Sequence, residues 1–180
     1  MSERFDPENM FGSIWDFPEN LTEALELGEK ISLNHAYSHI QNVVVAGMGG
    51  SAIGGDVISV LEKDSLEVPF VVCRGYSLPN WVNENTLVLC SSYSGNTEET
   101  LSALEDALSK NTQICGITTG GEIADKLKFF NKDVVFIPSG LQPRAALAFS
   151  FVPMAKCLEK AGVLTLSFGD WMDSSIETII

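Results

Sequence analysis

Five short apolar runs alternate with amphipathic stretches along the middle of the chain, at residues 42–47, 68–73, 86–91, 113–118 and 134–137. Each run is apolar and rich in β-branched residues, a pattern typical of strands that are buried on both faces. The stretches between them repeat apolar residues at helical spacing, as Ile53, Val57 and Val60 do after the first run. The alternation predicts an α/β fold in which helices cover both faces of a parallel sheet and right-handed crossovers connect its strands.

Helices are also expected on either side of this alternating region. A capping-box pattern that begins at Asn20 predicts the start of a helix running to about residue 32. A second, almost entirely apolar helix is predicted over residues 143–162, with Pro143 in its first turn and Gly162 just after its last.

Length and composition indicate a single domain. With 180 residues and 45% hydrophobic content, the chain is long enough for one well-buried core and too short for two. We divide it into a helical extension over residues 1–40, whose first 17 residues are expected to be irregular, and an α/β domain over residues 41–162. Residues 163–180 are expected to begin a linker or helix toward a second domain, or to pack on a second subunit, because the last three isoleucines have no visible partner.

The charge and the apolar pattern exclude several classes of partner. The chain has 11 basic and 24 acidic residues and a formal net charge of −13, which repels nucleic acid and anionic membranes, so local groups must hold any bound anion. Because no run is long enough to span a bilayer and no targeting signal is visible, we expect a soluble, cytoplasmic protein. The four cysteines are expected to be buried, reduced thiols. His35 and His39 lack a third ligand, so we expect them to be surface residues rather than a metal site.

Two glycine- and hydroxyl-rich turns follow the first and third predicted strands, at residues 47–51 and 92–97. Each turn opens a helical pattern, and the N-terminus of a helix offers unpaired N–H groups and the positive end of the macrodipole. The hydroxyls of Ser92, Ser94 and Thr97 add donors for phosphate oxygens. Both turns fall at carboxyl ends of parallel strands, where α/β folds bind ligands. Together they predict a site for a phosphorylated small molecule.

Other interpretations of the two turns stay open. Gly47, Gly49 and Ala52 also fit the G-x-G-x-x-A dinucleotide fingerprint. The acid that this fingerprint requires after the second strand is replaced by Arg74, which would suit the 2′-phosphate of NADP. The hydroxyls of residues 92–97 could also serve only as turn and cap residues. Binding explains them better because the other glycine turn lies nearby.

Charged residues beside the turns are assigned different roles. Glu98 and Glu99 fall in the first turn of a predicted helix, where acids complement the macrodipole, so we interpret them as dipole partners rather than catalytic groups. Asn96 and Glu99 are candidates for capping this helix. Arg144 lies at the start of the apolar helix, where a desolvated guanidinium needs an anionic partner, so we predict that it binds an anion or a developing oxyanion.

Four segments together resemble a known family: GMGGSAIGGD, RGYSLPNWV, SSYSGNTEET and QPRAALAFSF. In order and spacing they are similar to the amino-terminal half of the bifunctional phosphoglucose/phosphomannose isomerases, members of the sugar isomerase (SIS) domain superfamily. The resemblance covers most of residues 40–162. It implies a three-layer αβα sandwich with a five-stranded parallel sheet, a flavodoxin-like arrangement.

The resemblance also implies an activity and a set of site residues. These enzymes interconvert glucose 6-phosphate or mannose 6-phosphate with fructose 6-phosphate through an enediolate. They act as homodimers and use neither a metal nor an organic cofactor. The resemblance implies that Ser92, Ser94 and Thr97 bind the phosphate and that Gly50 and Ser51 contact the sugar. It implies that Arg144 stabilises the enediolate and is the catalytic residue.

One part of the family pattern is missing from this sequence. In the family, the glutamate that moves the proton and the histidine and lysine of ring opening come from a second SIS domain, and nothing here matches them. We therefore expect these 180 residues to be a phosphohexose-binding half that is inactive, or nearly so, by itself. A non-catalytic sugar-phosphate-binding module and an NADP-binding domain stay as alternatives.

Overall fold

The computed structural model describes residues 5–164, 172, 175, 176 and 178 of the chain. Its centre is a sheet of five parallel strands in the order β2-β1-β3-β4-β5. The strands are β1 (Asn42–Gly47), β2 (Phe70–Cys73), β3 (Thr86–Ser92), β4 (Gln113–Thr118) and β5 (Asp133–Phe136). The helices are α1 (Met10–Trp15), α2 (Phe17–Lys30), α3 (Gly49–Leu61), α4 (Glu98–Ser109), α5 (Gly121–Phe129) and α6 (Leu147–Lys160).

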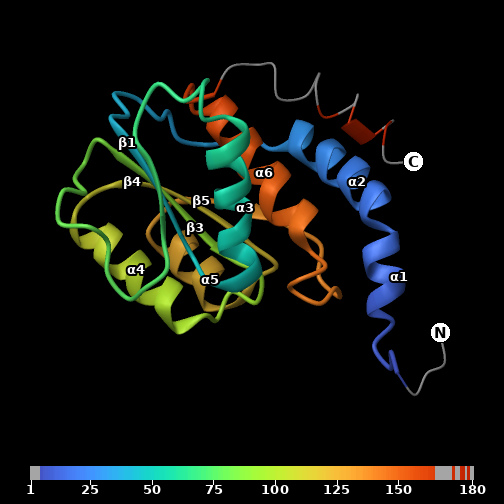
Figure 1. Ribbon diagram of the computed structural model, residues 1–180. Helices are drawn as coiled ribbons and strands as arrows, with labels where there is room; N and C mark the ends of the chain where they lie inside the picture. The colour runs from blue at the N-terminus through green and yellow to red at the C-terminus, as the bar shows by residue number, and fades with distance from the viewer. Residues whose placement is uncertain (1–4, 165–171, 173–174, 177, 179–180) are drawn as a thin grey trace.

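Helices cover both faces of the sheet (Figure 1). On one face, Val43 and Val45 of β1 belong to a core that they share with residues of α2, α3 and α6. Val44 and Ala46 point to the other face and belong to a second core with residues of α4 and α5. Because successive side chains of a strand alternate, covering both faces buries β1 almost completely. The predicted three-layer sandwich with a five-stranded parallel sheet is confirmed.

The apolar helix α6 packs between α3 and α2, which explains why it lacks a polar face. Its residues from Ala148 to Leu158 are all buried. Gly28 lets α2 approach closely, because a Cβ atom there would lie 2.7 Å from Cγ of Lys156. Lys156 extends its amino group outward to Glu29 of α2, at 2.7 Å. Helices α2, α3 and α6 therefore pack together on this side of the sheet.

The N-terminal segment differs from the sequence prediction in two places. Residues 10–15 form α1, where an irregular stretch was expected, and the carboxylate of Asp6 accepts hydrogen bonds from the first N–H groups of this helix at 2.7 and 2.9 Å. The next helix begins at Phe17 rather than near Asn20. Pro18 explains the earlier start, because its fixed φ suits a first helical turn and its missing N–H needs no partner there.

The start of α6 also differs from the prediction. The helix begins at Leu147 rather than at Pro143, which instead lies in a turn closed by a 2.8 Å hydrogen bond from the Ala145 N–H to the Gln142 carbonyl. Gly162 follows the other end of the helix with a φ of +75°, as the sequence predicted. The turn places Arg144 before the helix and not within it.

The C-terminal expectation is partly wrong. Ile176 is buried against the larger core, so it has apolar partners within the chain. Ile179 and Ile180 lie outside the described residues. Burial of Ile176 brings the last described residues back to the layer that contains α2 and α6.

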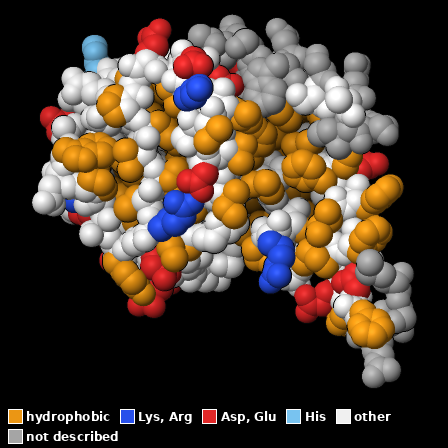
Figure 2. Space-filling model, viewed as in Figure 1, with side chains coloured by type: hydrophobic (Ala, Val, Ile, Leu, Met, Phe, Trp, Pro, Cys, Tyr) orange, Lys and Arg blue, Asp and Glu red, His pale blue; other side chains and the backbone are white. Residues whose placement is uncertain are grey.

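The N-terminal segment projects from the body of the molecule and exposes apolar side chains, which Figure 2 shows at its lower right. None of the residues of α1 is buried, and the exposed rings of Phe11 and Trp15 stack on each other with centroids 6.0 Å apart. Within the described residues, no helix is long and apolar enough to cross a membrane.

Candidate active site

The two glycine turns start from neighbouring strands. Gly47 at the end of β1 pairs in register with Ser91 near the end of β3. The strands approach so closely here that a Cβ atom on Gly47 would lie 2.8 Å from the carbonyl oxygen of Ser91. The turns themselves are bonded to each other, because the N–H of Tyr93 donates to Oγ of Ser51 at 3.0 Å. The structure therefore places both turns side by side at one edge of the sheet.

Hydroxyl groups shape the turn between β3 and α4 from within. Oγ of Ser92 accepts the N–H of Gly95 at 3.1 Å and lies 2.8 Å from the hydroxyl of Thr97. Oγ of Ser94 accepts the N–H of Asn96 at 3.2 Å. Ser92 is only 1% exposed, whereas Ser94 is exposed and Thr97 is half-buried. The hydroxyls of Ser94 and Thr97 are therefore accessible to a ligand, whereas the buried Ser92 hydroxyl contacts that of Thr97.

Helices α3 and α4 begin in these turns without a side-chain cap. Their N-cap residues, Met48 and Thr97, make no side-chain hydrogen bond to the helix that follows. The prediction that Asn96 caps α4 is wrong, because its Oδ1 instead accepts the N–H of Glu122 at 3.0 Å. The Ser51 N–H of α3 donates to the Met48 carbonyl at 3.1 Å. Otherwise each helix presents its first N–H groups and the positive end of its dipole at the shared edge, an arrangement that favours a bound anion.

A third glycine turn, at residues 118–122, was not recognised from the sequence. Its signal is visible there as Thr-Thr-Gly-Gly directly after the fourth strand. In the structure this turn supports its neighbour: the N–H of Ile123 donates to the Gly95 carbonyl at 2.9 Å, and the hydroxyl of Thr119 donates to the Tyr93 carbonyl at 2.7 Å. Two N–H groups in the first turn of α5, those of Glu122 and Ile123, are therefore occupied by residues of the neighbouring turn.

Arg144 reaches the same edge from the loop between β5 and α6. A Cβ atom on Gly50 would lie 2.7 Å from the carbonyl oxygen of Pro143 and 3.7 Å from Cα of Arg144. The start of α3 and the Arg144 turn are therefore in direct backbone contact. Arg144 is exposed, and within the described residues the ion pairs involve other cations. Its side chain is thus open to solvent, and its backbone lies beside the first glycine turn.

Arg74, the residue on which the NADP interpretation depends, has a partner of its own. Its guanidinium forms an ion pair with the carboxylate of Asp56 in α3. Because this carboxylate already neutralises the guanidinium, Arg74 is not placed to hold a 2′-phosphate. The dinucleotide interpretation therefore loses the residue that would have supported it.

Comparison with known proteins agrees with this geometry. No model of a protein family matches the chain. A bifunctional phosphoglucose/phosphomannose isomerase from Caldicellulosiruptor bescii is 48% identical over 155 residues, which cover 86% of this chain and 46% of the relative. An enzyme of the same name from Thermoplasma acidophilum is 42% identical over 113 residues, which cover 63% of this chain and 34% of the relative.

The chain belongs to the bifunctional phosphoglucose/phosphomannose isomerase family. It spans about half or less of the length of the curated relatives that it matches. Among solved structures, the C-terminal domain of glucosamine-fructose-6-phosphate aminotransferase from Francisella tularensis superposes with a TM-score of 0.69 at 16% identity. That match covers 99% of this chain and 54% of the other, and it shows a shared fold.

The other ionisable groups of this isomerase-family chain lie in structural contacts. Glu98 and Glu99, predicted as dipole partners, are near the exposed Tyr76, and their negative charges raise the pKa of its phenol. Cys73 is half-buried and the other three cysteines are buried, all as free thiols. Among the described residues, no cluster of three or more potential metal ligands occurs.

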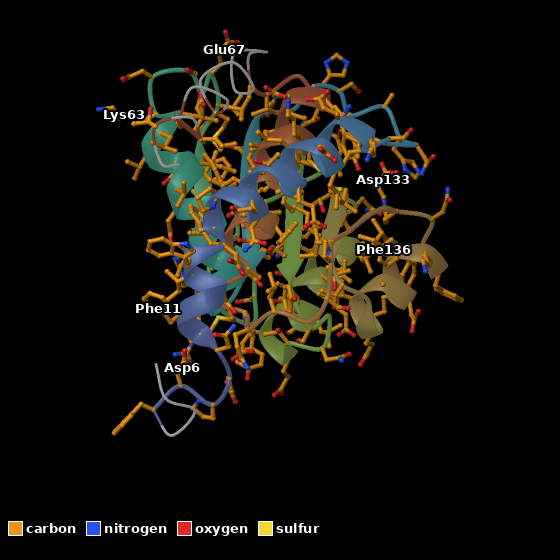
Figure 3. The ribbon with its side chains drawn as sticks, turned by 90° about the vertical axis from the view of Figure 1, so that its right-hand side faces the viewer. Asp6, Phe11, Lys63, Glu67, Asp133 and Phe136 are labelled. Carbon is orange, nitrogen blue, oxygen red and sulfur yellow. The ribbon has the colours of Figure 1, made fainter. Side chains whose placement is uncertain are left out.

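His35 was expected to be a surface residue, but it is half-buried and bonded to Asp133, at 3.1 Å from Nδ1 to Oδ2. Asp133 is 2% exposed and also accepts hydrogen bonds from the Asn34 N–H at 2.8 Å and the Tyr37 hydroxyl at 2.8 Å. Burial alone would raise the pKa of Asp133, but the hydrogen bonds from Asn34, Tyr37 and His35 together hold it below its usual range. Figure 3 shows Asp133 and Phe136 at opposite ends of β5, so this cluster lies away from the glycine turns.

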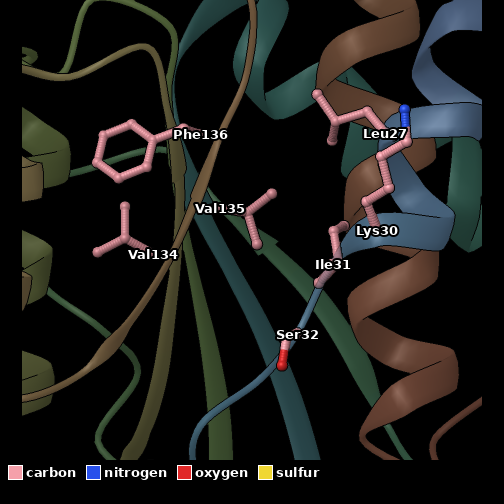
Figure 4. Close-up of a pocket in the computed structure, with 7 residues that line it drawn as sticks. All are labelled: Leu27, Lys30, Ile31, Ser32, Val134, Val135 and Phe136. Carbon is pink, nitrogen blue, oxygen red and sulfur yellow. The ribbon is translucent and has the colours of Figure 1, made fainter.

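Two hollows in the described part of the surface do not coincide with the predicted site. One of about 250 Å³ lies between the end of α2 and the edge strand β5, where Val135 faces Ile31 and Leu27 (Figure 4). Another of about 220 Å³ lies at the amino ends of the strands, beside Tyr37 and Gln113. Neither is lined by a residue of the predicted site, which is an open edge formed by turns.

Proposed function

We propose that this chain binds a phosphorylated hexose and serves the isomerisation of glucose 6-phosphate or mannose 6-phosphate to fructose 6-phosphate. The observation that carries the proposal is the meeting of three loops at one edge of the sheet. Two of them open helices without a side-chain cap at residues 47–51 and 92–97, and the third carries Arg144, which is exposed and forms no ion pair within the part of the chain that the structure describes. Their convergence agrees with the names of the curated relatives.

The phosphate group would lie over the turn at residues 92–97. The hydroxyls of Ser94 and Thr97 would donate to its oxygens together with the first N–H groups of α4. Ser92 would orient the Thr97 hydroxyl through the 2.8 Å contact between their oxygens. This arrangement holds a dianion despite the net charge of −13, because short-range donors outweigh the screened repulsion of distant carboxylates.

The sugar would extend from the phosphate toward the start of α3 and the Arg144 turn. Gly50 would let the backbone approach the sugar, and the Ser51 hydroxyl, which accepts the Tyr93 N–H, keeps its own proton free to donate. When a proton leaves C2 of the aldose, negative charge develops on the oxygen atoms of C1 and C2. The Arg144 guanidinium would stabilise that enediolate by a charge-assisted hydrogen bond.

The proton transfer itself needs a base that we place outside these 180 residues. A general base must reach the proton directly or through one water, and the carboxylates nearest to the phosphate turn, Glu98 and Glu99, are grouped around Tyr76. We propose that the base and the ring-opening histidine and lysine belong to a second SIS domain. We propose further a cytoplasmic homodimer without a metal or organic cofactor, as the family resemblance implies.

The proposed binding is tested by calorimetric titration of the chain with fructose 6-phosphate, glucose 6-phosphate and unphosphorylated fructose. Both esters should bind, and fructose should not bind measurably, because most of the affinity comes from the phosphate. Equal affinity for fructose and its phosphate ester would refute the proposed site. An isomerase assay of the chain alone should show little or no turnover, and rapid turnover would show that the base is present here.

A further inference from the structure

Tyr93 is bonded to three different loops at the edge of the sheet. Its N–H donates to Oγ of Ser51 at 3.0 Å, in the turn after β1. Its carbonyl oxygen accepts the N–H and the hydroxyl of Thr119, after β4, at 3.2 and 2.7 Å. Its phenol oxygen accepts the N–H of Leu141, after β5, at 2.9 Å. One residue of the phosphate turn therefore contacts all the other loops that surround it.

The bond to Leu141 is made just before the Arg144 turn. Leu141 follows Gly140, whose φ of +104° marks a sharp change of direction in this loop. The turn that carries Arg144 begins at Gln142, whose carbonyl accepts the N–H of Ala145 at 2.8 Å. The Tyr93 hydroxyl thus holds the loop at the residue from which the Arg144 turn departs.

The phenol ring is itself held in place. Tyr93 is half-buried, and its ring packs against the larger core of the molecule. Its hydroxyl therefore stands at a fixed point relative to the sheet, which a solvent-exposed side chain would not provide. Near this point, Nε2 of Gln142 also donates to the carboxylate of Glu8 at 2.8 Å, but that bond is exposed to solvent, whereas the bond from Leu141 to Tyr93 is partly buried.

We propose that Tyr93 is a positioning residue whose hydroxyl sets the place of Arg144 relative to the phosphate turn. The proposal rests on the proposed function, in which the phosphate and the enediolate lie at opposite ends of one hexose. A ligand of fixed length needs its two anion sites at a matching separation, and small misplacements of a charged group reduce its effect strongly. Tyr93 joins the two sites because its backbone belongs to one and its side chain holds the other.

The first test needs no ligand and compares Tyr93→Phe with the wild-type chain by amide hydrogen exchange. The variant keeps the packed ring and loses only the acceptor, so the Leu141 N–H should exchange at least about five times faster. Tyr37→Phe is the matched control, because it also removes a bonded hydroxyl from a half-buried ring, at the amino ends of the strands. It should leave Leu141 unchanged. Unaltered exchange at Leu141 in Tyr93→Phe would overturn the proposal.

The second test measures how well the site distinguishes an enediolate-like charge. Sorbitol 6-phosphate carries only the phosphate, whereas 5-phosphoarabinonate adds a carboxylate where the enediolate oxygens would lie. The dissociation constant of sorbitol 6-phosphate divided by that of 5-phosphoarabinonate reports the contribution of Arg144. In Tyr93→Phe this ratio should fall at least about threefold, while the affinity for sorbitol 6-phosphate changes less than about twofold. Tyr37→Phe should preserve the wild-type ratio.

The two tests separate the two proposals. Faster Leu141 exchange with an unchanged ratio would overturn the positioning role, and so would an equal loss of affinity for both ligands. If the wild-type chain binds neither ligand, the proposed function fails. The exchange rate of the Leu141 N–H in Tyr93→Phe then tests by itself whether the Tyr93 hydroxyl fixes the loop that carries Arg144. A lower ratio together with faster exchange at Leu141 supports the proposal.

Discussion

The hydroxyl of Ser51 accepts the backbone N–H of Tyr93 at 3.0 Å and so joins the first glycine turn to the turn at residues 92–97. Ser51 is only 8% exposed, and the bond lies directly beyond the paired ends of β1 and β3. A buried N–H that loses its acceptor costs more than an average hydrogen bond contributes. This bond therefore makes the two turns one structural unit.

Replacing Ser51 with alanine should weaken both stability and binding. The unpaired Tyr93 N–H should lower the free energy of unfolding by about 1 to 2 kcal/mol, as measured by urea denaturation. The affinity for fructose 6-phosphate should fall as well, because the turns lose their common bond. Ser59→Ala is the control, since its hydroxyl bonds only within the same helix, and it should change stability by less than about 0.5 kcal/mol. Wild-type stability in Ser51→Ala would contradict the prediction.

Replacing Ser94 with alanine should separate binding from folding. Its hydroxyl is exposed and accepts a single N–H bond within the turn, from Asn96. The free energy of unfolding should change by less than about 0.5 kcal/mol, while the affinity for the phosphate ester should fall about fivefold or more because one phosphate donor is lost. Titration and urea denaturation of the same sample measure both quantities. An unchanged affinity would remove Ser94 from the proposed phosphate site.

Replacing Gly95 with alanine should destabilise the domain strongly. The residue has a φ of +71°, and a Cβ atom would lie 1.8 Å from the carbonyl oxygen of Gly120. Strain and collision together should cost about 3 kcal/mol or more. Gly140→Ala is a matched control, because its φ of +104° brings strain but its Cβ would meet open space, and it should cost about 1 kcal/mol. An equal loss of unfolding free energy in the two variants would show that the loop containing Gly120 moves to accommodate the new methyl group.

Replacing Arg144 with alanine should leave the fold intact and change ligand preference. The side chain is exposed and unpaired among the described ion pairs, so unfolding should be unaffected within about 0.5 kcal/mol. The preference for 5-phosphoarabinonate over sorbitol 6-phosphate should be lost. Arg74→Ala is the control: it removes an ion pair with Asp56 on the surface, worth at most about 1 kcal/mol, and should not alter that preference.

Replacing Asp133 with asparagine should remove a pH-dependent part of the stability. Hydrogen bonds lower the pKa of Asp133 in the folded chain, so its contribution is complete above the unfolded value of about 3.9 and is lost as pH falls through the folded value. At pH 7 the variant should be less stable by about 3 kcal/mol, because several donors lose a charged acceptor. The difference from wild type should shrink below about pH 4. A difference independent of pH would contradict this account; Asp125→Asn, on the exposed surface of α5, is the control.

The sheet was predictable because local pattern and tertiary role agree there. The strand from Asn42 to Gly47 and the one from Gln113 to Thr118 have the bounds that their apolar runs predicted. Helix starts were less predictable. Asn20 and Pro143 carry valid start signals, but Pro18 starts one helix earlier, and the other helix begins only at Leu147, after a turn in which Pro143 lies against Gly50. A helix-start signal in the sequence reflects only local preferences, and the tertiary packing of the segment decides whether the helix begins there.

By itself, the sequence determined the α/β order, the two glycine turns and the family, because strand periodicity and helix-start chemistry are local properties of the chain. Only the tertiary structure decided which donors remain available. The fold buries the Ser92 hydroxyl and pairs the Arg74 guanidinium with Asp56. It also bonds the first turn of α5 to Asn96, whereas the Arg144 side chain is exposed. These outcomes depend on which loops the strand order β2-β1-β3-β4-β5 brings together, and that pairing is made between residues far apart in the chain.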